Sequence, residues 1–399
     1  MASKFTILIP TRNRCATLRY TIATCLAQQD DNLKVIVSDN VSSDKTRDVV
    51  ESFSDRRLQY VCTGKPLSMS GNFEFSLSKV SEGFVMHLGD DDGLVPDTLK
   101  RVRQTLARER TKAVTSSQAI YYWPSTMDTK SANTLVCSIK SGIERRSAKK
   151  FLKKVLNYQL PYSVLPSTYN GFVHHDVIAA ATSNGRYFNS SIPDCYSGIV
   201  NCGILDSYAY ENAPFLISGL SGKSNGSQVF SPSNADGATL YERPDDLILH
   251  PALVYCPALE IIVAQAFYHA RDHVPALKSF DMPIERICAA ALRDSPKWMY
   301  GLVTKAVADL RAKHGLEISV SNRGANNLSK PAILEAQSAF RRLLRGVRRM
   351  AEGYRVVDCR DFGVDNVQDA ARLAHFLASY AAHNYQGTAA RARRWVSRL

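Results

Sequence analysis

Apolar runs and polar segments alternate regularly over the first 120 residues of the chain. Short apolar runs predict strands at 5–9, 33–38, 58–62, 84–88 and 113–116. Between these runs, apolar residues recur at helical spacing, which predicts helices over 16–28, 44–53, 70–79 and 96–108. Strands and helices that alternate with short connections are typical of a parallel, doubly wound sheet. We therefore predict an α/β fold for this half of the chain.

The pattern changes beyond residue 120. Tyrosine-rich strands, a basic helix at 147–158 and Gly/Ser-rich loops mix up to about residue 250. From residue 251 the pattern is nearly all helical, with segments at 257–271, 284–293, 298–313, 331–351 and 366–383. We predict one domain over 1–250, with halves 1–118 and 119–250, followed by a helical region over 251–399. The pattern leaves open whether these helices pack on the sheet domain.

Polar residues follow three of the predicted strands. They are Thr11-Arg12-Asn13-Arg14 after the first strand, Asp39-Asn40 after the second, and Asp90-Asp91-Asp92 after the fourth. In doubly wound sheets, ligands bind beyond the carboxyl ends of the strands. The sequence therefore predicts a ligand site where these three segments converge.

The three adjacent carboxylates repel one another unless donors or a cation compensate their charge. A divalent cation of the Mg²⁺ or Mn²⁺ kind, bound together with substrate phosphates, would balance the charge. The alternative is a solvated acidic loop before the helix that Pro96 opens, since acids favour helix N-termini. Asp39 fits either a contact to a ribose or base, or a simple turn. No GxGxxG follows the first strand, which argues against a dinucleotide site.

A second loop, over residues 218–227, is rich in glycine and serine. Its Gly222-Lys223-Ser224 is not a P-loop ending, because Ile217 stands where the first glycine is required. Two interpretations stay open for Lys223 and Ser224: a lid over a diphosphate, or an ordinary surface loop.

The charge balance is basic, with 50 Lys and Arg against 37 Asp and Glu and a net charge of +13. The excess lies in the C-terminal third, where the segment 336–350 predicts an amphipathic helix with one arginine face (Arg341, Arg342, Arg345, Arg348 and Arg349). Such a helix fits either peripheral contact with an anionic membrane or a core-packed helix with solvated arginines. Because its only aromatic residue lies on the apolar face, we expect no nucleic-acid partner.

Cysteine usage and the N-terminus bear on location. The nine cysteines form no CxxC pair, which favours reduced thiols over a disulfide framework or a zinc site. The first apolar run is too short for a signal peptide, and no stretch is long and apolar enough for a membrane span. We expect a cytoplasmic protein, with contact at the inner face of the membrane as one option, and the sequence leaves an oligomer open.

Several motifs in combination resemble the GT-A glycosyltransferases of family 2 over about residues 4–230. The resemblance is carried by TILIPTRNR (6–14), VIVSDNVSSDKT (35–46), Gly71-Asn72, FVMHLGDDDGLVP (84–96) and IPDCYSGIVN (192–201). It implies a GT-A fold, a Rossmann-like nucleotide-binding sheet with helices on both faces. The mainly helical C-terminal region is not covered by it.

The resemblance also implies roles for individual residues. Pro10, Thr11, Arg12, Arg14, Asp39 and Asp90 match nucleotide-binding positions, Asp91 and Asp92 match the DxD motif that binds Mn²⁺ or Mg²⁺, and Asp194 matches the general base. The usual first acid of the DxD motif falls on Gly89, so the frame is ambiguous and Asp91 is the preferred ligand. Pro193 stands where glutamate is common beside the base, which makes Asp206 and Glu211 the nearby substitutes.

The implied activity is an inverting transfer of a sugar from a nucleotide-diphosphate sugar to a hydroxyl of a glycan or lipid-linked glycan. Two other classes are weighed against it. A sugar-nucleotide nucleotidyltransferase would carry a glycine-rich, basic signature after the first strand, and 10–14 contains no glycine. A catalytically idle GT-A-like binding protein stays open.

Overall fold

The structure is a computed structural model that describes residues 3–169, 171–224, 249–316 and 353–381. Its first part contains the predicted alternation of elements. The strands are β1 (Phe5–Thr11), β2 (Leu33–Asp39), β3 (Leu58–Cys62), β4 (Phe84–His87) and β6 (Ala113–Ser116). The helices between them are α1 (Cys15–Leu26), α2 (Thr46–Glu51), α3 (Met69–Leu77) and α4 (Thr98–Glu109). The predicted α/β pattern is confirmed for this half of the chain.

The main sheet has eight strands in the order β3-β2-β1-β4-β10-β6-β11-β9, which adds β9 (Ile143–Ser147), β10 (Gly171–His174) and β11 (Ser207–Glu211). Strands β1 to β4 run parallel to one another, as predicted. The sheet as a whole is mixed, however, because β10 lies antiparallel between β4 and β6. This close approach needs Gly171, since a Cβ there would overlap the Val114 carbonyl oxygen.

A second sheet has five strands in the order β13-β8-β7-β12-β5. Its strands are β5 (Gly93–Leu94), β7 (Ala119–Tyr122), β8 (Thr134–Ser138), β12 (Leu216–Leu220) and β13 (Tyr354–Asp358). The described part of the C-terminal region is mainly helical, as predicted, apart from strand β13. Its residues Val356 and Val357 are β-branched and pair with β8, so tertiary pairing decides its structure.

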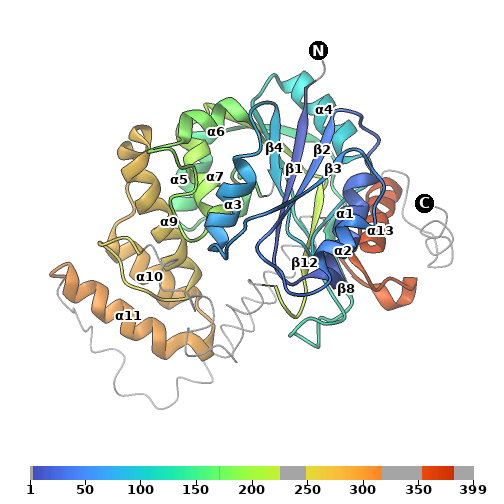
Figure 1. Cartoon of the computed structure of the whole chain (residues 1–399). Helices are drawn as coiled ribbons and strands as arrows, with labels where there is room; N and C mark the ends of the chain where they lie inside the picture. Colours follow the sequence, from blue (N-terminus) through green and yellow to red (C-terminus); the bar gives the residue numbers. More distant parts are fainter. Residues whose placement is uncertain (1–2, 170, 225–248, 317–352, 382–399) are drawn as a thin grey trace.

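The last described helix, α13 (Val367–Ala381), returns to the N-terminal half, and Figure 1 shows it beside α1. It buries Val367, Ala371 and Leu377 in one hydrophobic cluster with Tyr121 and Trp123. The C-terminal segment thus covers the second sheet and part of α1.

The remaining helices build a second layer on one side of the main sheet (Figure 1). They are α5 (Ala148–Leu156), α6 (His175–Ala181), α7 (Pro193–Ile204), α9 (Leu259–His273), α10 (Ile284–Asp294) and α11 (Tyr300–Lys313). The short 3₁₀ helices are η1 (Tyr162–Val164), η5 (Pro275–Ser279), η6 (Lys297–Met299) and η7 (Cys359–Phe362). Helix α9 packs on α7 and α10 packs on α9, within one continuous core cluster. The domain division at residue 250 stays a prediction.

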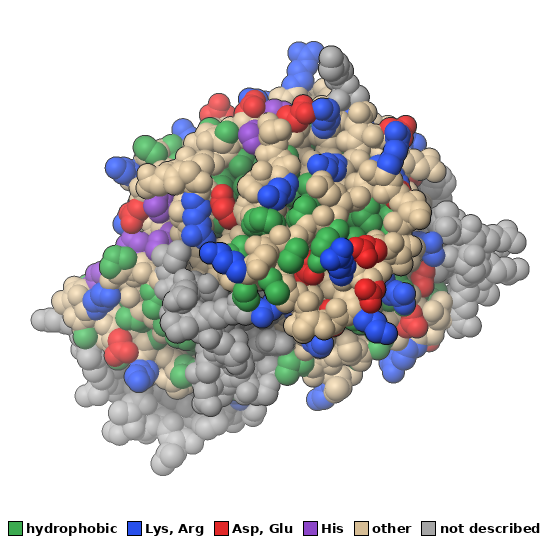
Figure 2. All heavy atoms as spheres, in the orientation of Figure 1, with side chains coloured by type: hydrophobic (Ala, Val, Ile, Leu, Met, Phe, Trp, Pro, Cys, Tyr) green, Lys and Arg blue, Asp and Glu red, His purple; other side chains and the backbone are tan. Residues whose placement is uncertain are grey.

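The surface charge and the length of the helices bear on the predicted contact with a membrane. Figure 2 shows acidic and basic side chains interspersed over the described part of one face, with no field of a single sign. Within the described ranges, each helix is too short or too polar to cross a lipid bilayer. The predicted basic helix at 336–350 lies outside the described residues.

Candidate active site

The loops after β1 and β2 meet at the carboxyl edge of the main sheet. Thr11 and Asp39 end neighbouring parallel strands and pair in register. Asp39 is buried, and its two carboxylate oxygens accept from the Ser42 amide at 2.9 Å and from the Tyr60 hydroxyl at 2.7 Å. Asn13 also holds the second loop, because its side-chain oxygen accepts from the Ser43 amide at 2.7 Å. The predicted convergence of these loops is therefore present.

The acidic loop after β4 joins the same edge. The Thr11 hydroxyl donates to Asp90 Oδ2 at 2.8 Å, which ties the loop after β1 to the loop after β4. Asp90 is partly exposed, whereas Asp91 and Asp92 are only 6% and 1% exposed. The three carboxylates predicted from the sequence thus lie together at this edge of the sheet, but they differ in exposure to solvent.

Asp92 anchors the loop. Its Oδ1 accepts from the Gly219 amide at 2.7 Å, and its Oδ2 accepts from the Gly89 amide at 3.1 Å and the Tyr169 hydroxyl at 2.8 Å. Both oxygens are therefore engaged by the protein itself. Such a carboxylate fixes the backbone of the loop and presents little of its surface to a ligand.

Asp91 is held by the end of the second sheet. Its Oδ2 accepts from the Ser221 hydroxyl at 2.7 Å and also from the Ser224 hydroxyl, just after β12. Its main-chain oxygen accepts from the Trp123 indole nitrogen at 3.0 Å. The loop predicted as a candidate lid therefore contacts Asp91, the residue predicted as the metal ligand.

The Arg14 guanidinium contacts that loop. One of its terminal nitrogens donates to the main-chain oxygen of Lys223. Its Nη1 is buried and has no hydrogen-bond partner among the described residues. An unpaired buried guanidinium donor beside acidic groups is suited to an anionic ligand.

The acidic loop holds its negative charge in a largely buried setting. Burial, and next the neighbouring Asp91 carboxylate, raise the pKa values of Asp90 and Asp92 above their usual range. The available donors are carboxylate and hydroxyl oxygens, which hard cations such as Mg²⁺ and Mn²⁺ prefer. In the described part of the chain, no group of three or more His, Cys, Asp and Glu side chains converges as a metal cluster. The residues thus fit a cation held by one or two carboxylates and completed by a substrate.

The structure gives a steric reason for the unusual DxD frame. A Cβ added at Gly89 would lie 2.7 Å from Asp92 Oδ2 and 2.7 Å from the Tyr169 hydroxyl. A side chain at position 89 would therefore require the Asp92 carboxylate and the Tyr169 hydroxyl to move from their present positions.

Asp194 lies in the first turn of α7, which Pro193 begins at a position where proline is well tolerated. It is partly exposed, and its Oδ2 accepts from the Tyr162 hydroxyl at 2.9 Å. Burial raises its pKa, although the Cys195 amide and the Tyr162 hydroxyl act in the opposite direction. A carboxylate with a raised pKa and an open side is suited to accepting a proton.

The two substitutes for Asp194 lie in other surroundings. Glu211 is buried and pairs with Arg101 at 2.6 Å, and it also accepts from the Thr105 hydroxyl. Asp206 is exposed between α7 and β11. Neither has the partly buried setting of Asp194.

Sequence reasoning missed the tyrosines of the site. Tyr169 interacts with the acidic loop and with Asp194. Burial raises the pKa of its hydroxyl, and the charges of Asp92, Asp91 and Asp194 raise it further. His87 was missed as well: it is fully buried, stacks on Phe73 at 4.7 Å between ring centroids, and burial lowers its pKa to about 3. The His87 side chain is therefore uncharged and packs in the core before the acidic loop.

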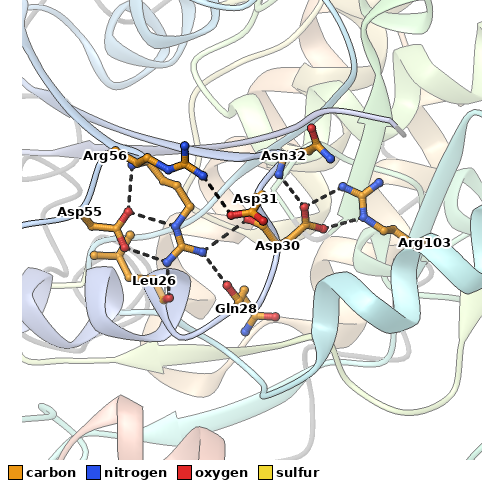
Figure 3. Close-up of polar contacts among 9 residues, drawn as sticks. Leu26, Gln28, Asp30, Asp31, Asn32, Asp55, Arg56 and Arg103 are labelled. Atoms are coloured by element: carbon orange, nitrogen blue, oxygen red, sulfur yellow. Dashed lines mark hydrogen bonds and ion pairs between the residues drawn. The ribbon is translucent and has the colours of Figure 1, made fainter. Parts of the chain in front are cut away.

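A polar cleft of about 560 Å³ lies at the opposite end of the parallel strands (Figure 3). Arg57 pairs there with Asp55 at 2.8 Å and donates to the main-chain oxygens of Leu26 and Gln28 at 2.6 and 2.7 Å. The Leu26 oxygen belongs to the last residue of α1 and the Gln28 oxygen follows two residues later, so Arg57 caps the end of this helix. The charged side chains of the cleft pair with one another, so we interpret the cleft as a structural feature and not as a ligand site.

Comparison with known proteins places a family resemblance on this site. Residues 6–169 match the model of glycosyl transferase family 2. The match includes β1, β2, β4 and the acidic loop, so the predicted resemblance to family 2 is confirmed for these elements.

Two curated relatives match parts of the chain. One is the GalNAc(5)-diNAcBac-PP-undecaprenol beta-1,3-glucosyltransferase of Campylobacter jejuni, 34% identical over 104 residues, which are 25% of this chain and 34% of that protein. The other is the validoxylamine A glucosyltransferase of Streptomyces hygroscopicus subsp. jinggangensis, 47% identical over 58 residues and 14% of each chain. The chain thus matches about a third or less of the length of these relatives. Among solved structures, S. aureus TarS 1–349 with UDP-GlcNAc aligns with a TM-score of 0.45 and 11% identity, over 96% of this chain and 93% of that one.

Proposed function

We propose that this chain is an inverting glycosyltransferase that moves a sugar from a nucleotide-diphosphate sugar to a hydroxyl of a glycan or lipid-linked glycan. The observation that carries the proposal is the meeting of Thr11, Asp39 and the acidic loop at one sheet edge, within the residues that match family 2. Asp194 stands within electrostatic range of the same tyrosine as that loop. We assign the loops after β1 and β2 to the nucleotide, the acidic loop to a cation, and Asp194 to the acceptor proton.

The donor nucleotide would lie against the loops after β1 and β2. Pro10, Thr11 and Arg12 line it, and Asp39 accepts from the base or ribose. Arg14 is the cationic partner for the diphosphate, because its buried Nη1 has no hydrogen-bond partner among the described residues. Asp90, linked to Thr11, completes the pocket on the side of the acidic loop.

Asp91 is the proposed ligand of Mn²⁺ or Mg²⁺. Asp92 supports it by fixing the loop, since both of its oxygens already accept hydrogen bonds from the protein. When bound, the cation would neutralise charge that builds on the leaving diphosphate. Lys223 and Ser224 are the proposed lid, because both contact the site through Arg14 and Asp91.

Asp194 is the proposed general base. It removes the proton of the acceptor hydroxyl while the new C–O bond forms, and the C–O bond to the diphosphate breaks on the opposite face. A single displacement of this kind inverts the configuration of the sugar and needs no second nucleophilic carboxylate.

The acceptor class and the location are part of the same proposal. The name of the Campylobacter relative specifies an undecaprenol-linked acceptor, which favours a lipid-linked glycan here. Peripheral contact with an anionic membrane rests on the segment 336–350, which lies outside the described residues. A cytoplasmic location and an oligomer stay predictions.

The test is a donor assay on the full chain. UDP-glucose, UDP-GlcNAc and GDP-mannose are each incubated with Mn²⁺, Mg²⁺ or EDTA, and released nucleoside diphosphate is measured. We expect cation-dependent release with at least one donor. A parallel assay with UTP and glucose 1-phosphate measures pyrophosphate, and release only there would replace the proposal by nucleotidyl transfer. No release and no donor binding by calorimetry would leave a protein without transferase activity and overturn it.

A further inference from the structure

One segment of the chain contacts both acidic groups of the site. It runs from η1 to the start of β10, over residues 162–169, and we call it the tyrosine segment. At its first residue the Tyr162 hydroxyl donates to Asp194 Oδ2 at 2.9 Å, and at its last residue the Tyr169 hydroxyl donates to Asp92 Oδ2 at 2.8 Å. The hydroxyls of two tyrosines thus reach two carboxylates from a single stretch of backbone.

The tyrosine segment is fixed along one face of α7. The Thr168 amide donates to the Ser197 hydroxyl at 3.3 Å, and the Asn201 side chain donates to the Pro166 main-chain oxygen at 2.7 Å. Asp194, Ser197 and Asn201 are spaced by three and four residues, so they share one helical face.

The tyrosine segment packs closely on α7 and is also tied to β11. A Cβ at Gly198 would lie 3.1 Å from the Leu165 Cβ, so the glycine allows the close approach. The Tyr208 hydroxyl in β11 also donates to the Val164 main-chain oxygen at 2.8 Å. Tyr162 is therefore held from two sides, and its hydroxyl has a defined position relative to Asp194.

We propose that Tyr162 is a positioning residue for Asp194, which fixes one carboxylate oxygen and leaves the other for the acceptor hydroxyl. This inference rests on the proposed role of Asp194 as the base. A hydroxyl that donates to a carboxylate favours its ionised form, and it restricts rotation of the carboxylate about its Cβ–Cγ bond. Both effects keep the base ready to accept a proton in a partly buried setting.

The groups around Asp194 set the direction of the effect. Burial raises the pKa of Asp194, while the Cys195 amide and the Tyr162 hydroxyl lower it. The other titratable groups that interact with it are the Cys195 thiol and the Tyr169 hydroxyl. Both are raised in pKa by burial and stay neutral near pH 7, so Tyr162 is the side chain whose removal changes the proton affinity of Asp194.

The experiment compares Tyr162→Phe with Tyr158→Phe. The Tyr158 hydroxyl donates to the Glu260 main-chain oxygen at 2.8 Å, so the control removes a half-buried tyrosine hydroxyl without touching a carboxylate. The first readout needs no activity: the full-length protein is labelled with ¹³C at aspartate side-chain carboxyls, and the Asp194 resonance is identified by its loss in Asp194→Asn. We expect its titration midpoint to rise by about one pH unit in Tyr162→Phe and to stay unchanged in Tyr158→Phe.

The second readout is the pH profile of kcat with the donor that the wild-type protein uses. In Tyr162→Phe we expect the acid limb to move upward with the resonance and kcat at the optimum to fall about tenfold, while the donor dissociation constant stays unchanged. An unshifted Asp194 resonance in Tyr162→Phe overturns the proposal, and so does an equal shift in Tyr158→Phe. Full transfer by Asp194→Asn would instead overturn the role of Asp194 as base, whatever the resonance does.

Discussion

The hydroxyl of Ser221 donates to Asp91 Oδ2 at 2.7 Å, across 130 positions of the sequence. Asp91 follows a strand of the main sheet, whereas Ser221 follows β12 of the second sheet. The acidic loop is therefore seated between the two sheets. Its geometry depends on both of them, and this has consequences that can be measured.

Replacing Asp91 with Asn should remove cation-dependent donor binding and leave the fold intact. Asparagine keeps an oxygen that can accept from Ser221 and Ser224, but it has no charge to offer a cation. Calorimetry with UDP-glucose and the other donors, with and without Mn²⁺, measures the effect. Asp48→Asn, which removes an exposed carboxylate from α2, is the control. The assignment fails if Asp91→Asn retains the Mn²⁺ dependence of the wild-type protein.

Replacing Asp194 with Asn should lower the rate of transfer by roughly 10²–10⁴-fold, the usual contribution of a general base. Donor binding should persist, because Asp194 lies in α7 and not in the loops after β1, β2 and β4. Initial rates of sugar transfer and the donor dissociation constant separate these two effects. Asp206→Asn is the matched comparison, and a loss of transfer there with none in Asp194→Asn would mean that the base has been misplaced.

Replacing Gly89 with Ala should decrease the free energy of unfolding by about 1–3 kcal/mol, the usual cost of overpacking. The new methyl group would meet Asp92 Oδ2 and the Tyr169 hydroxyl, both at 2.7 Å. Urea unfolding followed by circular dichroism gives the difference. Gly301→Ala in α11 serves as control, since no heavy atom lies within 4 Å of its added Cβ and alanine favours a helix. Equal stability of Gly89→Ala and the wild-type protein would contradict the steric account of the DxD frame.

Replacing Asp55 with Asn should destabilise the protein in a pH-dependent manner. The Arg57 side chain lowers the pKa of Asp55 to about 2 in the folded state. Its contribution is therefore complete above the unfolded-state pKa and is lost as the pH falls through about 2. We expect a loss of about 1–2 kcal/mol at pH 7 that vanishes toward pH 2, measured by urea unfolding across this range.

The control for Asp55 is Asp31→Asn. Its ion pair with Arg56 is largely exposed, with side chains 90% and 81% accessible, so it should contribute little at any pH. A loss in Asp55→Asn that did not change with pH would mean that packing, and not the ion pair, carries the effect.

The sequence was informative where structure is local. The elements over residues 5–116 follow from apolar periodicity, and the polar residues at the ends of β1, β2 and β4 follow from the parallel arrangement of those strands. These features need only neighbours in the chain or one general rule of sheet topology. The resemblance to family 2 rests on the same residues.

The rest depends on pairs that are distant in sequence. Tyr169 and Asp92 are 77 positions apart, and Trp123 and Asp91 are 32 apart, so no spacing rule connects them. The antiparallel insertion of β10 and the pairing of β13 with β8 likewise follow from tertiary contacts. In the sequence, Gly89 appears only as a departure from the DxD motif. The structure adds that a Cβ at this position would lie 2.7 Å from the Tyr169 hydroxyl.

The position of α13 also constrains the order in which the chain can assemble. During synthesis, α1 and the strands β5, β7, β8 and β12 of the second sheet emerge early, but the helix that covers them ends at Ala381. Val357 completes the edge of that sheet almost as late. Contacts between such distant segments form slowly, and the apolar surface that they cover stays open to other chains in the meantime. The nascent protein therefore passes through a long interval in which its N-terminal half is made but incompletely covered, and assistance from a chaperone would act in that interval.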